Sequence, residues 1–174
     1  MAPTKATLAA APCTPPDHFR ELMSGFPTGV GVVTAFRADG RPMGMTCSSI
    51  CSVSLEPPVL LVALRSASPT LAAVLDGSAF SLNLLHEGAR EVAKLFASGD
   101  ADRFDRVDWR RGSVGGGPHL ADAAHAMADC RVTRHEAVGD HTVVYGEVVA
   151  TVTAPGAARP LLYGQRRYAS WPAA

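Results

Sequence analysis

Residues 43–64 read MGMTCSSICSVSLEPPVLLVAL, and the fold predicted for the rest of the chain is organised around this stretch. Its first half is a run of small side chains, most of them hydroxyl-bearing, which Pro57-Pro58 ends. Its second half, Val59–Leu64, is a continuous apolar run typical of a strand buried on both faces. Serine and threonine fill a core poorly but offer hydrogen-bonding groups. A solvated loop is one interpretation; the flanking core strands favour a site for a polar, planar ligand.

The size and composition of the chain limit the classes of protein to which it can belong. With 174 residues it is long enough for one domain with a substantial core. Sixteen basic and sixteen acidic residues balance, so the sequence predicts no nucleic-acid partner. Four scattered cysteines predict reduced thiols, and no apolar run reaches the ~20 residues of a membrane span. We predict a disordered leader over residues 1–16, a single domain over residues 17–174, and a cytoplasmic protein.

The remaining pattern predicts mostly strands. Asp17 and Ser68 predict N-caps of helices, and Asp39-Gly40 and Gly139-Asp140 predict hairpin turns. Residues 99–118 predict a long loop, in which the glycines at 115–117 give flexibility and lack the pattern of a phosphate-binding loop. Strands are expected over residues 29–37, 42–49, 59–64, 79–85, 124–134, 141–154 and 161–168, and helices over residues 17–26, 69–77 and 87–98. An antiparallel barrel with a few short helices fits this order better than a parallel α/β sheet.

The sequence lacks the motifs of most hydrolases and metalloenzymes. Its six histidines form no metal-binding pattern, and it has neither a serine nucleophile motif nor a close pair of carboxylates. His141 differs from the others because it follows a turn at the mouth of the predicted barrel, although a histidine at a turn is usually just solvated. A pocket that offers hydroxyls and backbone donors without acid, base or metal suits an enzyme whose cofactor carries the chemistry.

Several short motifs occur together in one order. They are PTGVGVVTA (27–35), GMTCSSICSVSLEPPVLLVAL (44–64), FSLNLL (80–85), FA (96–97), RF (103–104), GDH (139–141) and YGEV (145–148). Over residues 19–171 the chain thereby resembles the short-chain flavin reductases, which supply reduced flavin to two-component flavin monooxygenases.

This resemblance implies a mainly β fold, an antiparallel split β-barrel of Greek-key type with a few short flanking helices. It implies a homodimer in which flavin binds near the subunit interface. The implied activity is transfer of a hydride from NADH or NADPH to N5 of FAD or FMN, with diffusible reduced flavin passing to a partner monooxygenase. Two alternatives keep the fold: an FMN-dependent oxidase with tightly held flavin, and a non-catalytic flavin-binding protein. The choices between FAD and FMN and between NADH and NADPH stay open.

The resemblance also implies which residues form the site, and none of them binds a metal. The flavin-binding positions are Thr46, Cys47, Ser48, Ser49, Ser52, Val53, Ser54, Ser66, Ser68, Thr70, Asn83, Arg103 and Phe104. The NAD(P)H-binding positions are His141, Arg166, Arg167 and Tyr168. Among these, His141 is expected to position the nicotinamide for catalysis and not to donate a proton.

Overall fold

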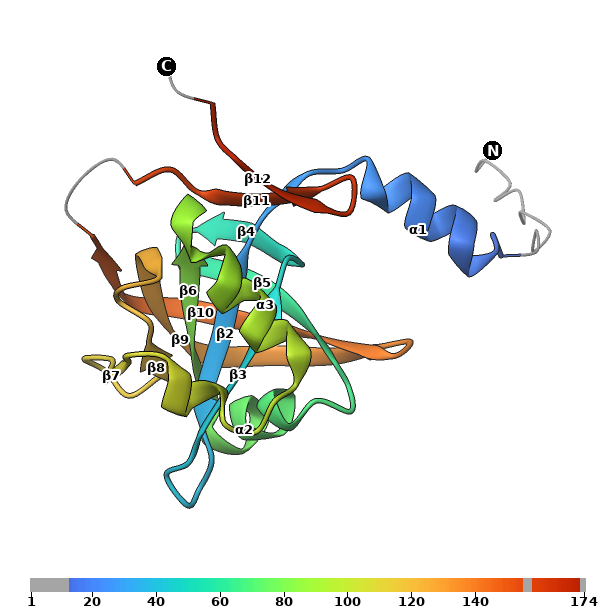
Figure 1. The fold of residues 1–174 in the computed structure, drawn as a ribbon. Coiled ribbons are helices and arrows are strands. Elements are labelled where there is room, and N and C mark those ends of the chain that lie inside the picture. Colours follow the sequence, from blue (N-terminus) through green and yellow to red (C-terminus); the bar gives the residue numbers. More distant parts are fainter. Residues whose placement is uncertain (1–12, 155–157, 173–174) are drawn as a thin grey trace, which may run out of the picture.

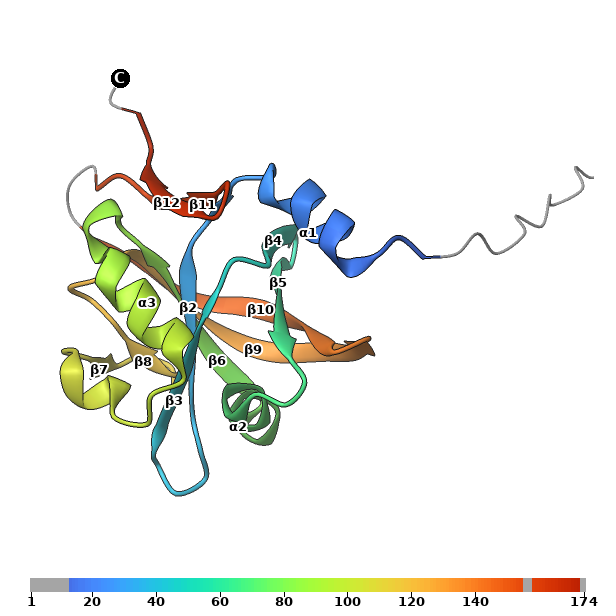
Figure 2. The same cartoon turned by 45° about the vertical axis from the view of Figure 1, so that its right-hand side comes forward.

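A seven-stranded antiparallel sheet dominates the computed structural model, which describes residues 13–154 and 158–172. Its strands are β2 (Gly31–Phe36), β3 (Pro42–Cys47), β4 (Ile50–Leu55), β5 (Pro58–Arg65), β6 (Ala79–Leu85), β9 (Ala124–Val138) and β10 (His141–Thr153). Their order in the sheet is β3-β2-β6-β9-β10-β5-β4. The two edge strands, β3 and β4, are joined only by Ser48 and Ser49, so the sheet curls until its edges approach each other (Figures 1 and 2). The prediction of mainly antiparallel β-structure with a few helices is confirmed.

Two hairpins of this sheet turn at the glycines that the sequence predicts. Gly40 (φ 80°) lies between β2 and β3, and Gly139 (φ 59°) lies between β9 and β10. β5 differs from its prediction, because Val62 and Leu64 are buried whereas Ala63 between them is only half-buried. The strand therefore alternates, with one face in the core and the other facing a hollow.

A second, smaller sheet contains β1 (Thr28–Gly29), β11 (Leu161–Gly164) and β12 (Arg167–Ser170). The prediction of a single strand over residues 161–168 is wrong, because the chain turns back at Gln165 and Arg166, whose φ values are 49° and 60°. Two-residue turns of this kind usually carry Asn-Gly, so Gln-Arg gave no turn signal. The backbone N–H of Gln165 donates to the carbonyl of Ser24 at 2.6 Å. This hydrogen bond connects the β11–β12 hairpin to the last residue of helix α1 (Pro16–Ser24).

Within the described residues the α-helices are α1 (Pro16–Ser24), α2 (Pro69–Gly77) and α3 (Arg90–Ser98), and the 3₁₀ turns are η1 (Glu87–Ala89) and η2 (Arg103–Arg106). α2 begins where predicted, since the Ser68 hydroxyl accepts the Thr70 N–H at 3.1 Å. The predicted cap at Asp17 is wrong: Pro15 is the N-cap of α1, and Asp17 lies in its first turn. Residues 1–12 of the predicted leader lie outside the described residues.

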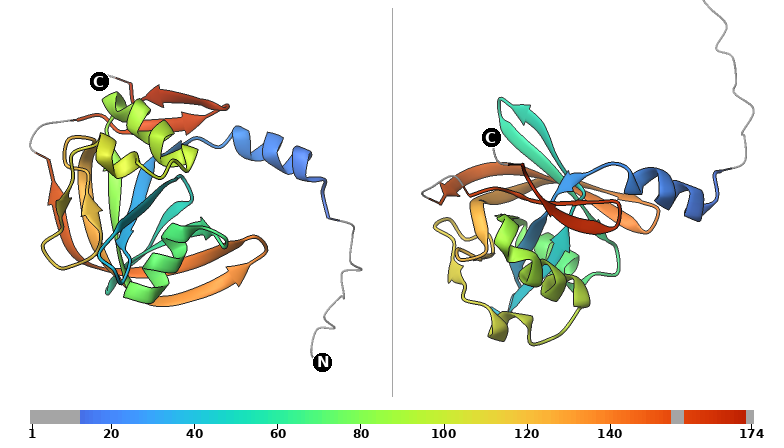
Figure 3. Two further views of the ribbon diagram at one scale, coloured as in Figure 1. Left: turned by 60° about the horizontal axis from the view of Figure 1, so that its bottom comes forward. Right: turned by 45° about the horizontal axis from the view of Figure 1, so that its top comes forward.

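The position of α1 is unlike that of the other helices. It buries none of its side chains, and Figure 3 shows it extending away from the sheets. α3, in contrast, lies against β3: a Cβ on Gly44 would come within 3.0 Å of the rings of Phe96 and Phe104. Among the residues that the structure describes, no helix is long and apolar enough to span a membrane.

The glycine-rich segment after η2 is packed and not flexible. Its short strands β7 (Arg110–Arg111) and β8 (Pro118–His119) pair with each other, and Gly116 and Gly117 are buried. A Cβ on Gly117 would lie 2.2 Å from the carbonyl oxygen of Thr34, so only glycine allows this close approach to β2. The prediction of an unpacked loop is therefore wrong for Gly116 and Gly117, whereas Gly115 is exposed.

Candidate active site

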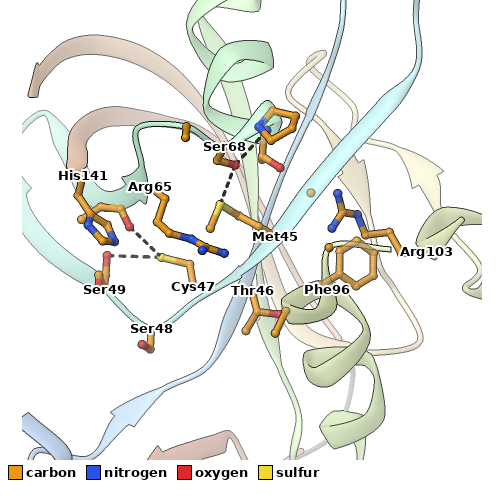
Figure 4. Close-up of a pocket in the computed structure, with 17 residues that line it drawn as sticks. Met45, Thr46, Cys47, Ser48, Ser49, Arg65, Ser68, Phe96, Arg103 and His141 are labelled. Atoms are coloured by element: carbon orange, nitrogen blue, oxygen red, sulfur yellow. Dashed lines mark hydrogen bonds between the residues drawn. The ribbon is translucent and has the colours of Figure 1, made fainter. Parts of the chain in front are cut away.

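A cavity of about 460 Å³ lies between β3, the end of β5, the N-terminus of α2 and the C-terminus of α3 (Figure 4). Eight of the predicted site residues line it: Thr46, Cys47, Ser48, Ser49, Ser68, Thr70, Arg103 and His141. They come from four separate parts of the chain, which the fold brings to one place. Met45, Arg65 and Phe96, which were not predicted, line the same cavity.

The wall formed by β3 is held by hydrogen bonds to its neighbours. The Thr46 hydroxyl donates to the carbonyl of Ala93 on α3 at 2.6 Å. The Cys47 sulfur lies 3.7 Å from each of two carbonyl oxygens, those of Ser49 and Ala63. Burial raises the pKa of the Cys47 thiol to about 11, so the thiol stays protonated at neutral pH and acts as a small packing group.

The N-terminus of α2 faces the cavity with its capping residue. The Ser68 hydroxyl accepts from Thr70 N–H and contacts the sulfur of Met45 at 3.2 Å. The backbone N–H groups in the first turn of a helix have no acceptor within the helix, so this end of α2 carries partial positive charge. It favours an anionic group in the cavity, such as a phosphate.

Arg103 brings a full positive charge to the same cavity. Arg103 is only 8% exposed, and it has no ion-pair partner among the described residues. The neighbouring carboxylates of Asp100 and Asp102 instead contact Arg106, at 3.4 and 4.0 Å. Burial lowers the pKa of the Arg103 guanidinium, the charge of Asp100 opposes this, and the group remains protonated at neutral pH. A buried cation without a partner is costly, so this position calls for an anionic ligand.

His141 begins β10 at the opposite end of the cavity from Arg103 (Figure 4). Its Nδ1–H donates to the Asp140 carboxylate at 2.8 Å. The pKa of Asp140 is lowered, first by this hydrogen bond and then by the charges of His141 and Arg65. Because Asp140 uses Nδ1, Nε2 remains for contact with a ligand.

The other predicted flavin-binding residues lie outside the cavity lining. Ser52, Val53 and Ser54 are on β4, Ser66 is 3.2 Å from the Thr142 hydroxyl, and Phe104 packs edge-on against Phe96 with ring centroids 5.0 Å apart.

Asn83, also predicted to bind flavin, is fully buried and does not line the cavity. Its amide nitrogen donates to the carbonyls of Val32 and Pro118, both at 3.2 Å, and its Oδ1 accepts the Leu120 N–H at 2.8 Å. The side chain holds the glycine-rich segment on the sheet and has no group left for flavin.

The C-terminal residues predicted to bind NAD(P)H are separated from His141. Arg166 lines a second hollow of about 970 Å³, the α1 groove, which lies between α1, β4, β5 and β11. Arg167 donates to the Gln165 side chain at 3.1 Å, and Tyr168 packs beside Arg90, whose guanidinium carbon is 5.7 Å from the ring centroid. The α1 groove and the cavity share two lining residues, Ser48 and Ser49.

Comparison with known proteins agrees with this geometry. The flavin reductase-like domain model matches residues 23–172. A flavin reductase (NADPH) of Lentzea aerocolonigenes is 50% identical over 91% of this chain and 91% of that protein. A flavin reductase (NADH) of Kitasatospora aureofaciens is 44% identical over 90% of this chain and 82% of that protein.

Solved structures give the same result. An NADH:FAD oxidoreductase of Streptomyces globisporus, in complex with NAD and FAD fragments, has a TM-score of 0.84 at 33% identity and covers 93% of this chain and 98% of its own. Component B of a nitrilotriacetate monooxygenase from Mycobacterium thermoresistibile also has a TM-score of 0.84 at 33% identity, over 90% of this chain and 86% of that one. The predicted resemblance is confirmed, and the chain belongs to the flavin reductase family of enzymes.

Proposed function

We propose that this flavin reductase transfers a hydride from NADH or NADPH to FAD or FMN and releases the reduced flavin to a partner monooxygenase. One observation carries the proposal: Arg103, a buried arginine with no ion-pair partner among the described residues, shares a cavity with the N-terminus of α2. Both features favour the phosphate of a flavin. Ser68 and Thr70 line the same cavity.

The residues along β3 supply the rest of the flavin site. Thr46, Cys47, Ser48 and Ser49 would line the ring and the ribityl chain, since they give small side chains and hydrogen-bonding groups along one wall. A bound flavin supplies the hydride acceptor, and the chain contributes alignment, because hydride transfer needs the two reacting atoms in contact. Neutral hydroxyls suit a flavin that has to leave after each turnover.

His141 would orient the nicotinamide at the other end of the cavity. Asp140 fixes its tautomer through Nδ1, so Nε2 can hydrogen bond to the substrate. This is a positioning contact, and the hydride transfer itself requires no proton from the imidazole.

We also propose that the curled sheet is a split barrel of Greek-key type and that the protein works as a cytoplasmic homodimer. The exposed apolar side chains of α1 and the residue just after it support a dimer: Phe19, Leu22 and Met23 on α1 and Phe26 beyond it are 44–71% exposed. Such a concentration of exposed apolar side chains marks an interaction surface. Sedimentation or light scattering at micromolar concentration tests this directly.

The test of the function is NADH and NADPH oxidation at 340 nm by purified protein, with FAD, FMN or riboflavin added. We expect turnover that saturates with added flavin, and protein that carries little flavin after purification. In the same assay His141→Ala should raise the KM for NADH far more than the KM for flavin. A yellow protein that ignores both nucleotides would be a flavin-dependent oxidase, and a colourless, inert one a binding protein; either refutes the proposal.

A further inference from the structure

Arg65 places a second cation in the cavity. It is the last residue of β5, and Figure 4 shows its guanidinium inside the cavity, near Cys47 and between His141 and Arg103. Its side chain makes no ion pair with another described residue. The lining of the cavity contains no carboxylate side chain, so the charge of Arg65 is not neutralised there. Unlike the buried Arg103, Arg65 is exposed to solvent, so its charge is accessible to an anionic ligand.

The nearest acid does not change this result. Asp140 is close enough for the charge of Arg65 to contribute to lowering its pKa, after the hydrogen bond and the charge of His141. Its side chain is 92% exposed, and its carboxylate is hydrogen bonded to His141. Water therefore screens the attraction between Asp140 and Arg65, and Arg65 lines the cavity without a close ion-pair partner among the described residues.

The two arginines occupy different places in the cavity. Arg103 is beside Phe96 and the C-terminal end of α3, whereas the side chain of Arg65 extends from the side of His141 to the middle of the cavity (Figure 4). Arg65 and His141 are direct cross-strand partners in the β5–β10 ladder. Directly opposed residues have their Cβ atoms about 5 Å apart on the same face of the sheet, which is within the span of one nucleotide unit.

The proposed reaction requires two phosphate-bearing substrates whose rings meet in one cavity, and each needs its own cation. We infer that Arg65 binds the diphosphate of the nicotinamide dinucleotide, beside the nicotinamide at His141, whereas Arg103 binds the phosphate of the flavin. This inference rests on the proposed function. According to this inference, Arg65 contributes to binding of the dinucleotide and not to binding of the flavin.

The test is a comparison of Arg65→Ala and Arg65→Lys with the wild type. A charge-assisted contact to a phosphate contributes enough that Arg65→Ala should raise the KM for NADH about 10- to 100-fold. The KM values for FAD, FMN and riboflavin should not change. Arg65→Lys should restore part of the loss, because lysine keeps the charge but not the two-pronged geometry. Arg131→Ala is the matched control, since Arg131 is an exposed arginine paired with Glu147 away from the cavity.

A hydride donor without phosphate separates this contact from other roles. The wild type and Arg65→Ala should reduce flavin at equal rates with N-benzyl-1,4-dihydronicotinamide. If the variant is slowed as much with this donor as with NADH, or if its KM rises for FAD more than for FMN, Arg65 acts on the flavin and the inference is overturned.

Calorimetry with ADP-ribose tests the same contact without turnover. The wild type should bind it and Arg65→Ala should lose most of the affinity; equal affinities would overturn the inference. Failure of the proposed function, in contrast, would appear as a wild type that oxidises neither nucleotide with any flavin.

Discussion

The cavity and the buried polar cluster beneath the glycine-rich segment contain similar side chains but use them differently. The buried polar cluster consists of Ser81, Asn83, His119 and Asp129, which are 0–4% exposed. Its charged and ionisable groups are paired with one another: the Asp129 Oδ1 accepts from the Ser81 hydroxyl at 2.5 Å and is hydrogen bonded to His119 Nε2 at 2.7 Å, whereas the Asp129 Oδ2 has no hydrogen-bond partner among the described residues. In the cavity, Arg65 and Arg103 have no counter-ion among the described residues.

This difference identifies the binding site better than composition does. Both regions contain hydroxyls, a histidine and a charged group, and a sequence pattern does not separate them. The carboxylate of the buried polar cluster is paired with His119 and holds the fold together, whereas the two arginines of the cavity have no counter-ion among the described residues and so have binding capacity left. The following predictions test whether the two regions really divide in this way.

The largest effect is expected from Gly117→Ala, above the buried polar cluster. The new Cβ would lie 2.2 Å from a backbone oxygen of β2, which cannot move without disturbing the sheet. We expect the free energy of unfolding in urea to fall by about 3 kcal/mol. Gly115→Ala is the control, because nothing lies within 4 Å of its Cβ position and only its φ of 83° is strained; it should cost about 1 kcal/mol. Equal losses would mean that the close approach to Thr34 is unimportant.

Asn83→Ala should destabilise the protein without a specific effect on flavin. It removes the acceptor of the Leu120 N–H and the donor to the Pro118 carbonyl, both buried. Leaving such groups unpaired costs about 2 kcal/mol, measurable by urea denaturation. The KM for flavin of the folded variant should stay at the wild-type value. Unchanged stability with a raised KM would return Asn83 to the flavin site.

Arg103→Ala should show the opposite pattern. Loss of one charge-assisted phosphate contact is worth about 1.5 kcal/mol, so the KM for FMN should rise roughly tenfold. Riboflavin has no phosphate, and its KM should be the same in the variant and the wild type. Stability should not fall, because the substitution removes a buried charge that has no partner. A similar rise for riboflavin would show that Arg103 acts on the ring or on the shape of the cavity.

The smallest effect is expected from ionisation of the buried thiols at high pH. Each of the two regions contains or adjoins one such thiol. Burial raises the pKa of Cys47 beside the cavity to about 11, and burial together with the Asp129 charge raises that of Cys130 to about 12, from the ordinary 9.0. Their contribution to stability is therefore complete below pH 9.0 and decreases as the pH rises toward 11 and 12. At pH 8, alkylation followed by mass spectrometry should label exposed Cys13 and Cys51 and spare both buried thiols. Native labelling of Cys47 would show that the cavity wall opens.

The elements that the sequence predicted correctly have local signals. The Gly40 and Gly139 turns and the Ser68 cap each depend on neighbouring residues, and those predictions are confirmed. The hairpin at Gln165 and Arg166 has no such signal, because tertiary contacts such as the Gln165–Ser24 hydrogen bond hold it. The packing of Gly117 was missed for the same reason.

The candidate site was predictable where consecutive residues form one wall. Residues 46–49 line the cavity together because a strand and its link place them there. Asn83 was misplaced because a motif does not state which face of a strand is covered by a later segment. Arg65 was missed because it ends an apolar strand, and only the ladder that pairs it with His141 reveals its position.

The link Ser48–Ser49 has a consequence for regulation by assembly. These two residues line both the cavity and the α1 groove. A protein segment bound in the groove would therefore contact residues that also form the wall of the cavity. Any coupling of their occupancies through this shared wall is reciprocal. If a second subunit fills the groove and the two occupancies are coupled, dilution of the enzyme changes its affinity for flavin, and saturation with flavin changes the dimer dissociation constant by the same factor.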